Sequence, residues 1–247
     1  MRTIRAVAFD CYGTLINFDE RNFVQTVQKL LSAHGVNHIS ENLVWDKWMD
    51  SARNHAKSIG RDPMASIDGP EPPFYRFAEI WPQHFKYAFE NTKVSNITPE
   101  TALAFFFDQL SQAPAYEESW EILLAIQKAG YRTAIASNAD DAHIYPVLRR
   151  AGIHVDLVVT SESVKSYKPR RPFFEKLCGR LDLKKSQVLF VGDSLFSDIR
   201  GARNAGLPAY WVQRTPSTDV TEILPYHPNW IYPDLRGLHT VLLGNNE

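Results

Sequence analysis

From Pro114 to the C-terminus, short apolar segments alternate with segments of helical pattern. The apolar segments have the length of buried strands and occupy residues 131–136, 157–160, 187–191 and 209–212. The helical segments occupy residues 117–129, 141–150, a stretch that begins at Pro172, and residues 197–205. A further apolar run, residues 4–9, ends abruptly at Asp10. Because strands that alternate with helices form parallel sheets with helical crossovers, this pattern predicts an α/β fold with a doubly wound parallel sheet.

Residues 17–113 have a different texture, because apolar residues there recur at helical spacing instead of in short runs. One stripe at this spacing consists of Phe77, Ile80, Trp81, Phe85, Ala88 and Phe89. Thr98 followed by Pro99 is typical of a helix start, with threonine as the N-cap and proline in the first turn. We therefore expect a helical region inserted after the first strand.

The charge balance excludes some classes of partner. The chain has 27 Lys and Arg residues against 28 Asp and Glu residues, a formal net charge of −1. Binders of nucleic acid or of anionic membranes normally carry a basic excess, so neither partner is expected. No apolar run approaches the roughly 18 residues that a membrane span needs, and the two cysteines, Cys11 and Cys178, do not suggest a disulfide framework. We expect a cytoplasmic protein that is a monomer or a homodimer.

Polar residues stand where the predicted strands end. Asp10, Ser137 and Asp193 each close an apolar run. In a parallel sheet the carboxyl ends of the strands form the edge outside which ligands bind. The turn after Asp10 contains Gly13 and can offer backbone N–H groups to an anion, while Ser137 and Asn138 offer neutral hydrogen-bond donors. The sequence therefore predicts a site for a small anionic metabolite at this edge.

The charges of this edge indicate a metal ion. Asp10, Asp193 and Asp198 would bring three carboxylates together, whereas Lys168 is the one nearby cation in the predicted arrangement. Three carboxylates beside a single lysine repel one another unless another cation lies among them. A hard divalent ion with oxygen ligands meets that need, and Mg²⁺ is the expected cofactor.

Four motifs, in this order, resemble those of the haloacid dehalogenase superfamily of hydrolases. They are Phe9-Asp10-Cys11-Tyr12-Gly13-Thr14-Leu15, then Ser137-Asn138, then Lys168-Pro169 followed by Phe174, and last Val191-Gly192-Asp193-Ser194 continuing to Asp198 and Gly201. The resemblance implies a Rossmann-like catalytic core made of residues 1–16 and 114–247. Residues 17–113 would be the inserted helical cap that closes over the site.

The resemblance also implies the role of each residue. Asp10 would be the nucleophile that forms a covalent aspartyl intermediate. Ser137 and Lys168 would hold the oxygens of the transferred group. The remaining substrate contacts and the metal ligands follow from the same motifs: Tyr12, Gly13, Thr14 and Asn138 at the substrate, and Asp10, the Tyr12 carbonyl, Asp193 and Asp198 at Mg²⁺.

The first motif departs from that of the superfamily's phosphatases. They carry an aspartate two residues after the nucleophile, which protonates the leaving group, and this chain has Tyr12 there. A tyrosine, with a reference pKa of about 10, is a poor proton donor at neutral pH. Tyr12 resembles instead the branch that cleaves 2-haloacids, because a departing halide needs no proton.

The third and fourth motifs favour the phosphatases. The dehalogenase branch lacks the pair that is Gly192-Asp193 here and has a tyrosine at the position of Phe174. Phosphoryl transfer gains directly from a divalent ion. The sequence therefore favours a Mg²⁺-dependent phosphatase for small phosphorylated metabolites. The alternatives are a metal-free 2-haloacid dehalogenase with an aspartyl ester, and a non-catalytic protein that keeps the fold and binds a ligand or partner.

Overall fold

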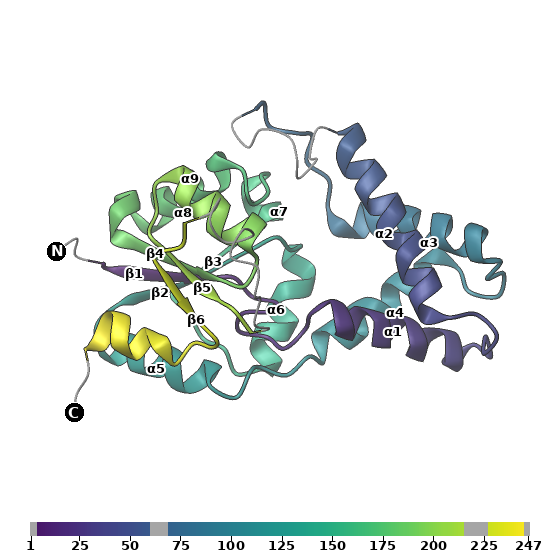
Figure 1. Cartoon of the computed structure of the whole chain (residues 1–247), viewed down its shortest axis with the longest axis horizontal. Helices are drawn as coiled ribbons and strands as arrows, with labels where there is room; N and C mark the ends of the chain where they lie inside the picture. The colour runs from purple at the N-terminus through teal and green to yellow at the C-terminus, as the bar shows by residue number, and fades with distance from the viewer. Residues whose placement is uncertain (1–3, 60–68, 215–226, 245–247) are drawn as a thin grey trace. The chain divides into compact units, whose positions relative to one another are not determined.

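The computed structural model describes residues 4–59, 69–214 and 227–244, which form two compact units (Figure 1). The first unit contains the chain up to Asn17, Pro114–Asn138 and the residues from Ala151 onward. The second contains Phe18–Ala113 and Ala139–Arg150. The predicted helical region thus forms a unit that also includes helix α6 (Asp141–Arg150), which the sequence placed in the core. The assignment of catalytic and cap roles to 1–16 with 114–247 and to 17–113 stays a prediction.

The first unit is built on a parallel sheet with the strand order β3-β2-β1-β4-β5-β6. Its strands are β1 (Ala6–Phe9), β2 (Arg132–Ser137), β3 (Leu157–Thr160), β4 (Val188–Gly192), β5 (Ala209–Val212) and β6 (Trp230–Tyr232). The chain runs outward from β1 to β3 and then returns to add β4, β5 and β6 on the other side of β1. The predicted doubly wound, Rossmann-like α/β fold is confirmed. The point where the order reverses, between β1 and β4, is where such sheets bind ligands.

Helices cover both faces of this sheet (Figure 1). Helix α5 (Ser119–Lys128) lies on one face, and α8 (Arg171–Leu181) and α9 (Gly201–Ala205) lie on the other. Side chains alternate between the faces along each strand, so Ala8, Ala136 and Phe190 join one buried cluster with Phe174 of α8. The short helices of this unit are α7 (Ser161–Val164), η1 (Lys185–Gln187), η2 (Leu195–Arg200) and η3 (His239–Leu243).

The observed elements differ from the predicted ones mainly in short segments. Strands β3 and β5 have the predicted bounds, but β6 was not predicted, because its three residues are only partly buried and too few to show a pattern. The predicted helix at residues 197–205 is divided into the π-helical turn η2 and the α-helix α9. The turn begins early because the Ser194 hydroxyl accepts a hydrogen bond from the Ser197 N–H at 3.0 Å.

The second unit packs its helices around aromatic side chains. Besides α6 it contains α1 (Glu20–Ala33), α2 (Glu41–Ser58), α3 (Phe77–Thr92) and α4 (Pro99–Ser111). The Phe23 ring lies between 5.1 and 6.2 Å, centroid to centroid, from the rings of Phe18, Trp45, Trp48, Trp81 and Phe106. The predicted cap of α4 is confirmed, because Thr98 accepts a hydrogen bond from the Thr101 N–H at 3.1 Å.

Across the described residues, we find no helix that combines the length and the apolar character required to cross a membrane.

Two helical glycines of the first unit give a matched test of its packing. A Cβ at Gly201 would lie 2.6 Å from the Phe174 ring and 2.8 Å from the Pro169 Cα, whereas a Cβ at Gly179 meets no atom within 4 Å. Gly201→Ala should therefore lower the free energy of unfolding by about 1–3 kcal/mol through overpacking. Gly179→Ala should be neutral or should raise it by up to about 1 kcal/mol. Urea unfolding measures both, and equal effects would contradict the tight contact at Gly201.

Candidate active site

The site lies where the strand order reverses. Strands β1 and β4 are neighbours in register, with Phe9 opposite Val191, so the residues that follow them emerge side by side. The Asp10 N–H continues this pairing with a 2.8 Å hydrogen bond to the Val191 carbonyl. Asp193 follows Gly192, the last residue of β4. Two acidic residues 183 positions apart in the sequence therefore lie at the same edge of the sheet.

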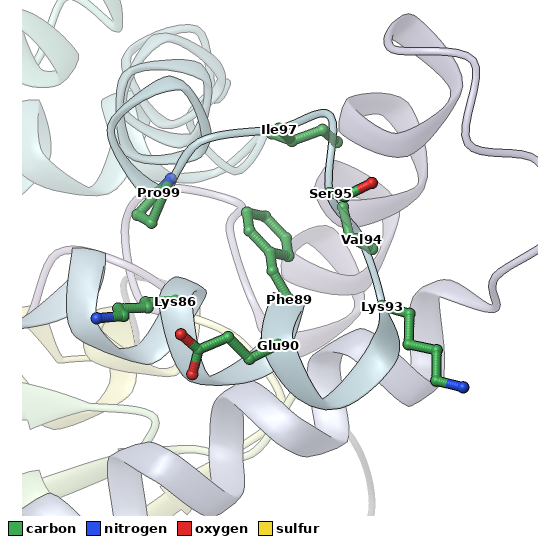
Figure 2. A pocket seen from close by; sticks show the side chains of 8 residues that line it. All are labelled: Lys86, Phe89, Glu90, Lys93, Val94, Ser95, Ile97 and Pro99. Carbon is green, nitrogen blue, oxygen red and sulfur yellow. The ribbon is translucent and has the colours of Figure 1, made fainter.

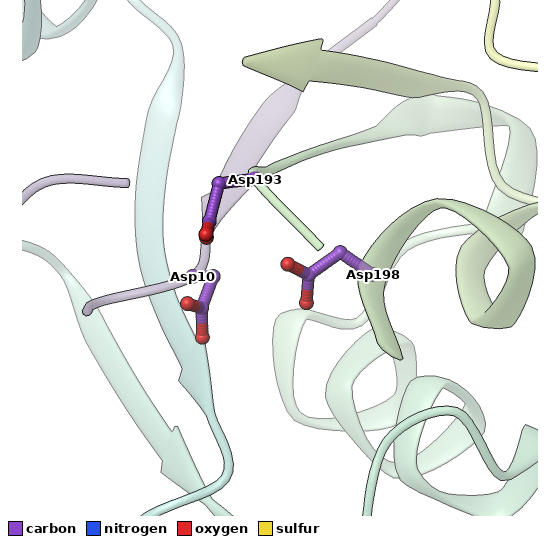
Figure 3. Close-up of side chains that lie close together, drawn as sticks. All are labelled: Asp10, Asp193 and Asp198. Carbon is purple, nitrogen blue, oxygen red and sulfur yellow. The ribbon is translucent and has the colours of Figure 1, made fainter. Parts of the chain in front are cut away.

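A third carboxylate completes the cluster. Asp10, Asp193 and Asp198 each offer an oxygen within 4.8 Å of the others, and Figure 3 shows the three side chains converging. Asp198 belongs to η2 and turns back toward β4, where one of its oxygens accepts a 3.0 Å hydrogen bond from the Ser194 N–H. A Cβ at Gly192 would overlap the Asp198 carboxylate, so glycine is required at that strand end. The predicted convergence of three carboxylates is what the structure shows.

Lys168 is the cation of this cluster. Its Nζ lies 2.6 Å from Asp10 Oδ1 and 2.6 Å from Asp198 Oδ1, and all three side chains are buried. Burial by itself lowers the pKa of Lys168, but the charges and hydrogen bonds of Asp10 and Asp198 outweigh burial and raise the pKa. The ammonium group therefore stays charged, and it fixes one oxygen of the predicted nucleophile.

The carboxylates retain more negative charge than Lys168 neutralises. Burial, and after it the charges of Asp198 and Asp10, raise the pKa of Asp193 to about 8, although Thr14 and Lys168 act in the opposite direction. Burial likewise raises the pKa of Asp198 to about 6, against the opposing effect of Lys168. Burial is the largest cause of both shifts, and the charge of Asp10 adds to it in each group.

The loop after β1 brings Thr14 against Asp193. The fully buried Thr14 hydroxyl donates a 2.9 Å hydrogen bond to Asp193 Oδ1. Gly13 has a φ of +82°, and a Cβ on it would overlap the Asp193 carboxylate, so only glycine permits this approach. Thr14 was predicted to contact substrate, but the structure shows its hydroxyl bound to the predicted metal ligand.

The second motif also has a positioning role. The Asn138 side chain accepts a hydrogen bond from the Lys168 N–H at 2.8 Å and donates one to the Lys168 carbonyl at 3.0 Å. It therefore holds the backbone from which Lys168 extends. Ser137, the last residue of β2, is buried next to β1 at the same edge of the sheet. Substrate contacts of Ser137, Asn138, Tyr12 and Gly13 stay predictions.

Cys11 does not compete with Asp10 as a nucleophile. Its side chain is fully buried, and burial together with the nearby Asp10 charge raises the pKa of the thiol well above its usual value. The thiol stays protonated at neutral pH, and a protonated thiol is a poor nucleophile.

The donor set fits a hard divalent cation. Asp10 Oδ2 and Asp193 Oδ2 accept no hydrogen bond from the residues that the structure describes, whereas both oxygens of Asp198 are engaged by Lys168 and Ser194. Asp10 and Asp193 are therefore the side chains able to ligate Mg²⁺ directly, since carboxylate oxygens are its preferred protein ligands. Asp198 would support the ion through Lys168. The Tyr12 carbonyl stays a predicted ligand.

Sequence reasoning missed two residues near the end of β5. The Trp211 indole donates a 2.8 Å hydrogen bond to the Asp193 carbonyl. The Arg214 guanidinium donates to the Gly13 and Thr14 carbonyls and pairs with Glu118. Both residues belong to no motif, although their place at or just beyond the carboxyl end of a predicted strand was an available signal.

The helical unit contains a separate hollow of about 570 Å³ (Figure 2). Its lining consists of Lys86, Phe89, Glu90, Lys93, Val94, Ser95, Ile97 and Pro99. Among the described residues that line it, Glu90 is the one carboxylate, and no acidic cluster like that at the edge of the sheet is found there.

The geometry of the site agrees with a family match over most of the chain. Residues 4–206 match the haloacid dehalogenase-like hydrolases. The chain belongs to this family. The predicted superfamily is thereby confirmed, and the conclusion that the protein is a hydrolase of this family follows with it.

Relatives within the haloacid dehalogenase-like hydrolases include both reaction types. The chain is 27% identical to (S)-2-haloacid dehalogenase 1 of Pseudomonas sp. strain CBS-3, over 87% of this chain and 86% of that one. It is 34% identical to the ribulose-1,5-bisphosphate 5-phosphatase of Halopiger xanaduensis, over 47% of this chain and 48% of that one. The fold matches that of a HAD-hydrolase of Bacillus subtilis bound to magnesium, with a TM-score of 0.76, 16% identity, and coverage of 98% of this chain and 99% of that one.

The raised pKa of Asp193 predicts how the metal-free protein responds to pH. A carboxyl group with a higher pKa in the folded state binds its proton more tightly when folded. Its contribution to stability is complete below the ordinary pKa near 4 and is lost as the pH rises toward about 8. With EDTA present, the melting temperature should fall more from pH 5 to pH 8 in the wild type than in Asp193→Asn. Mg²⁺ should restore the melting temperature of the wild type at pH 8 but not that of the variant. Equal pH slopes in the two proteins would contradict this electrostatic account.

Proposed function

We propose that this hydrolase is a Mg²⁺-dependent phosphatase for small phosphorylated metabolites that forms an aspartyl-phosphate on Asp10. The observation that carries the proposal is the cluster of three carboxylates, of which Asp10 and Asp198 are buried and pair with Lys168, while Asp193 is half-buried. With all groups ionised, two negative charges remain uncompensated. A phosphate would be repelled from such a site, whereas a bound divalent cation removes the repulsion.

Asp10 is oriented for nucleophilic attack. Lys168 holds Asp10 Oδ1 at 2.6 Å and so fixes the orientation of the carboxylate that is proposed to attack phosphorus. In the first step the Asp10 oxygen bonds to phosphorus and the bond to the leaving alkoxide breaks. The alkoxide takes its proton from water, because position 12 offers no carboxylic acid. In the second step water attacks the phosphorus, releases inorganic phosphate and restores the carboxylate.

The other groups of the site stabilise the transferred phosphoryl group. When bound, Mg²⁺ supplies positive charge to the phosphoryl oxygens. The Lys168 ammonium contacts the Asp10 carboxylate and adds a second positive charge. Asp198 holds that ammonium in place through its own 2.6 Å contact. Ser137 is proposed to donate a hydrogen bond to the phosphoryl group.

A 2-haloacid dehalogenase is the second candidate. Tyr12 favours it, as does the 27% identity to a dehalogenase along 220 residues. Attack at carbon, however, gains nothing from a cation on the nucleophile, and Asp193 would then be a half-buried carboxylate of raised pKa without a catalytic use. This cost in stability is the physical reason to prefer the phosphatase.

Metal removal separates the candidates. The wild type, assayed on phosphoesters, acyl phosphates and 2-haloacids, should release phosphate with Mg²⁺ and lose that activity in EDTA. Asp10→Asn should lower kcat by more than about 10³-fold, as loss of a nucleophile typically does. Chloride release that is insensitive to EDTA would instead establish the dehalogenase. Absence of both activities, with no covalent adduct on Asp10 by mass spectrometry, would leave a non-catalytic binding protein.

Tyr12 predicts a preference for good leaving groups. Without a carboxylic acid at that position, an acyl phosphate should be hydrolysed faster than a hexose phosphate by about 10²-fold, the usual contribution of a general acid. Tyr12→Asp should raise the rate on the hexose phosphate, and the control Tyr12→Phe should not. Equal wild-type rates on the two substrates, or a folded Tyr12→Asp variant that is no faster, would refute this role of position 12.

A further inference from the structure

The carboxyl end of β5 contacts both acidic loops of the site. Trp211, which lies on β5, donates its indole N–H to the Asp193 carbonyl at 2.8 Å. Arg214, two residues after the end of the strand, donates Nε to the Gly13 carbonyl at 2.9 Å and Nη2 to the Thr14 carbonyl at 2.5 Å. Both residues lie beyond the part of the chain that matches the family, residues 4–206.

The guanidinium of Arg214 is itself held firmly. Its Nη1 pairs with Glu118 Oε1 at 2.9 Å, where the two side chains are 17% and 5% exposed. Its central carbon lies 3.3 Å from the centre of the Tyr116 ring. A guanidinium that is fixed on one side by a buried carboxylate and stacked on an aromatic ring presents its remaining donors in a rigid fork. That fork binds two consecutive carbonyls of the loop after Asp10.

The contacts continue from the loop to the acidic cluster. Thr14 accepts the Arg214 hydrogen bond with its carbonyl and donates its hydroxyl to Asp193 Oδ1 at 2.9 Å. The main chain of Asp193 is held by Trp211 and its side chain by Thr14. The orientation of Asp193 thus depends on two residues from the end of β5, one acting directly and one through Thr14.

We infer that Arg214 is a positioning residue for this hydrolase. It holds the loop of residues 11–16 against the sheet edge and, through Thr14, aims the Asp193 carboxylate at the cation site. The inference rests on the proposed function for its catalytic consequence. The loop-holding role itself applies to whichever reaction Asp10 carries out.

Amide hydrogen exchange tests the loop-holding role without substrate or metal. In Arg214→Met, peptides that cover residues 10–17 should exchange at least about 10-fold faster, because the hydrogen bonds of Leu15 and Ile16 to the Cys11 carbonyl would open more often. Arg180→Met is the matched control: Arg180 also donates to a backbone carbonyl, that of Ser163 at 2.8 Å, but contacts neither acidic loop. Equal loop exchange in wild type and Arg214→Met would overturn the inference.

Kinetics test the consequence for the site. Arg214→Met should lower kcat and raise the Mg²⁺ concentration for half-maximal activity by about 10–100-fold, the usual effect of losing a residue that orients a metal ligand, with little change in KM. Arg214→Lys should recover part of the loss, because lysine can still donate to a carbonyl. If the wild type is active and Arg214→Met has the same kcat and Mg²⁺ dependence, the inference is overturned while the phosphatase proposal stands.

Two further variants guard against misfolding and against failure of the proposed function. Arg214→Met combined with Glu118→Gln removes both charges, so no unpaired buried charge destabilises the fold, and it should keep the fast loop exchange. Glu118→Gln alone keeps the hydrogen bonds from Arg214 to the Gly13 and Thr14 carbonyls. It should therefore accelerate loop exchange less than Arg214→Met does. If the wild type hydrolyses no phosphate but loop exchange rises in Arg214→Met, the phosphatase proposal fails while the loop-holding role stands.

Discussion

The buried contact of Lys168 with Asp10 and Asp198 is the interaction on which the rest of the site depends. One ammonium group at 2.6 Å from two carboxylates fixes both of them. The same contact leaves Asp193 without an ion pair among the residues that the structure describes. Asp193 has a hydrogen bond from Thr14 in place of an ion pair, and burial and two like charges raise its pKa.

The sheet topology gathers these groups with little need for long side chains. Strands β1 and β4 are adjacent because the chain crosses back at this point, so both of their carboxyl ends open into the same crevice. The backbone of Gly13 lies against the Asp193 carboxylate, and that of Gly192 lies against the Asp198 carboxylate. A Cβ at either glycine would overlap the carboxylate beside it. The rigid sheet thereby sets the separations among the acidic groups, and the loops set only their orientation. This division of roles is consistent with one family supporting attack at phosphorus and attack at carbon from the same aspartate.

Much of this site was predictable from the chain. The strand runs, the acidic residues that close them, and Lys168 were visible as local patterns, and the structure brings Asp10, Asp193, Asp198 and Lys168 together as expected. Asn138 and Thr14 were predicted to contact substrate, and in the structure they form hydrogen bonds with Lys168 and Asp193. The sequence shows that a side chain is able to form hydrogen bonds, but it does not show which partner the side chain binds. Arg214 and Glu118, which are 96 residues apart, were missed for a related reason, since neither lies in a local pattern that marks the other.

The sequence by itself determined the alternation of strands and helices from β1 to β5, the acidic residues at the strand ends and the family, because each of these is written in short-range periodicity or in compact motifs. Tertiary structure decided which donors each carboxylate receives, how α6 groups with the helical unit, and how the end of β5 supports the loop after Asp10. These depend on distances between residues far apart in the chain. Such distances are fixed only when the strands pair in register. Buried polar groups then form hydrogen bonds with partners that are distant in the sequence.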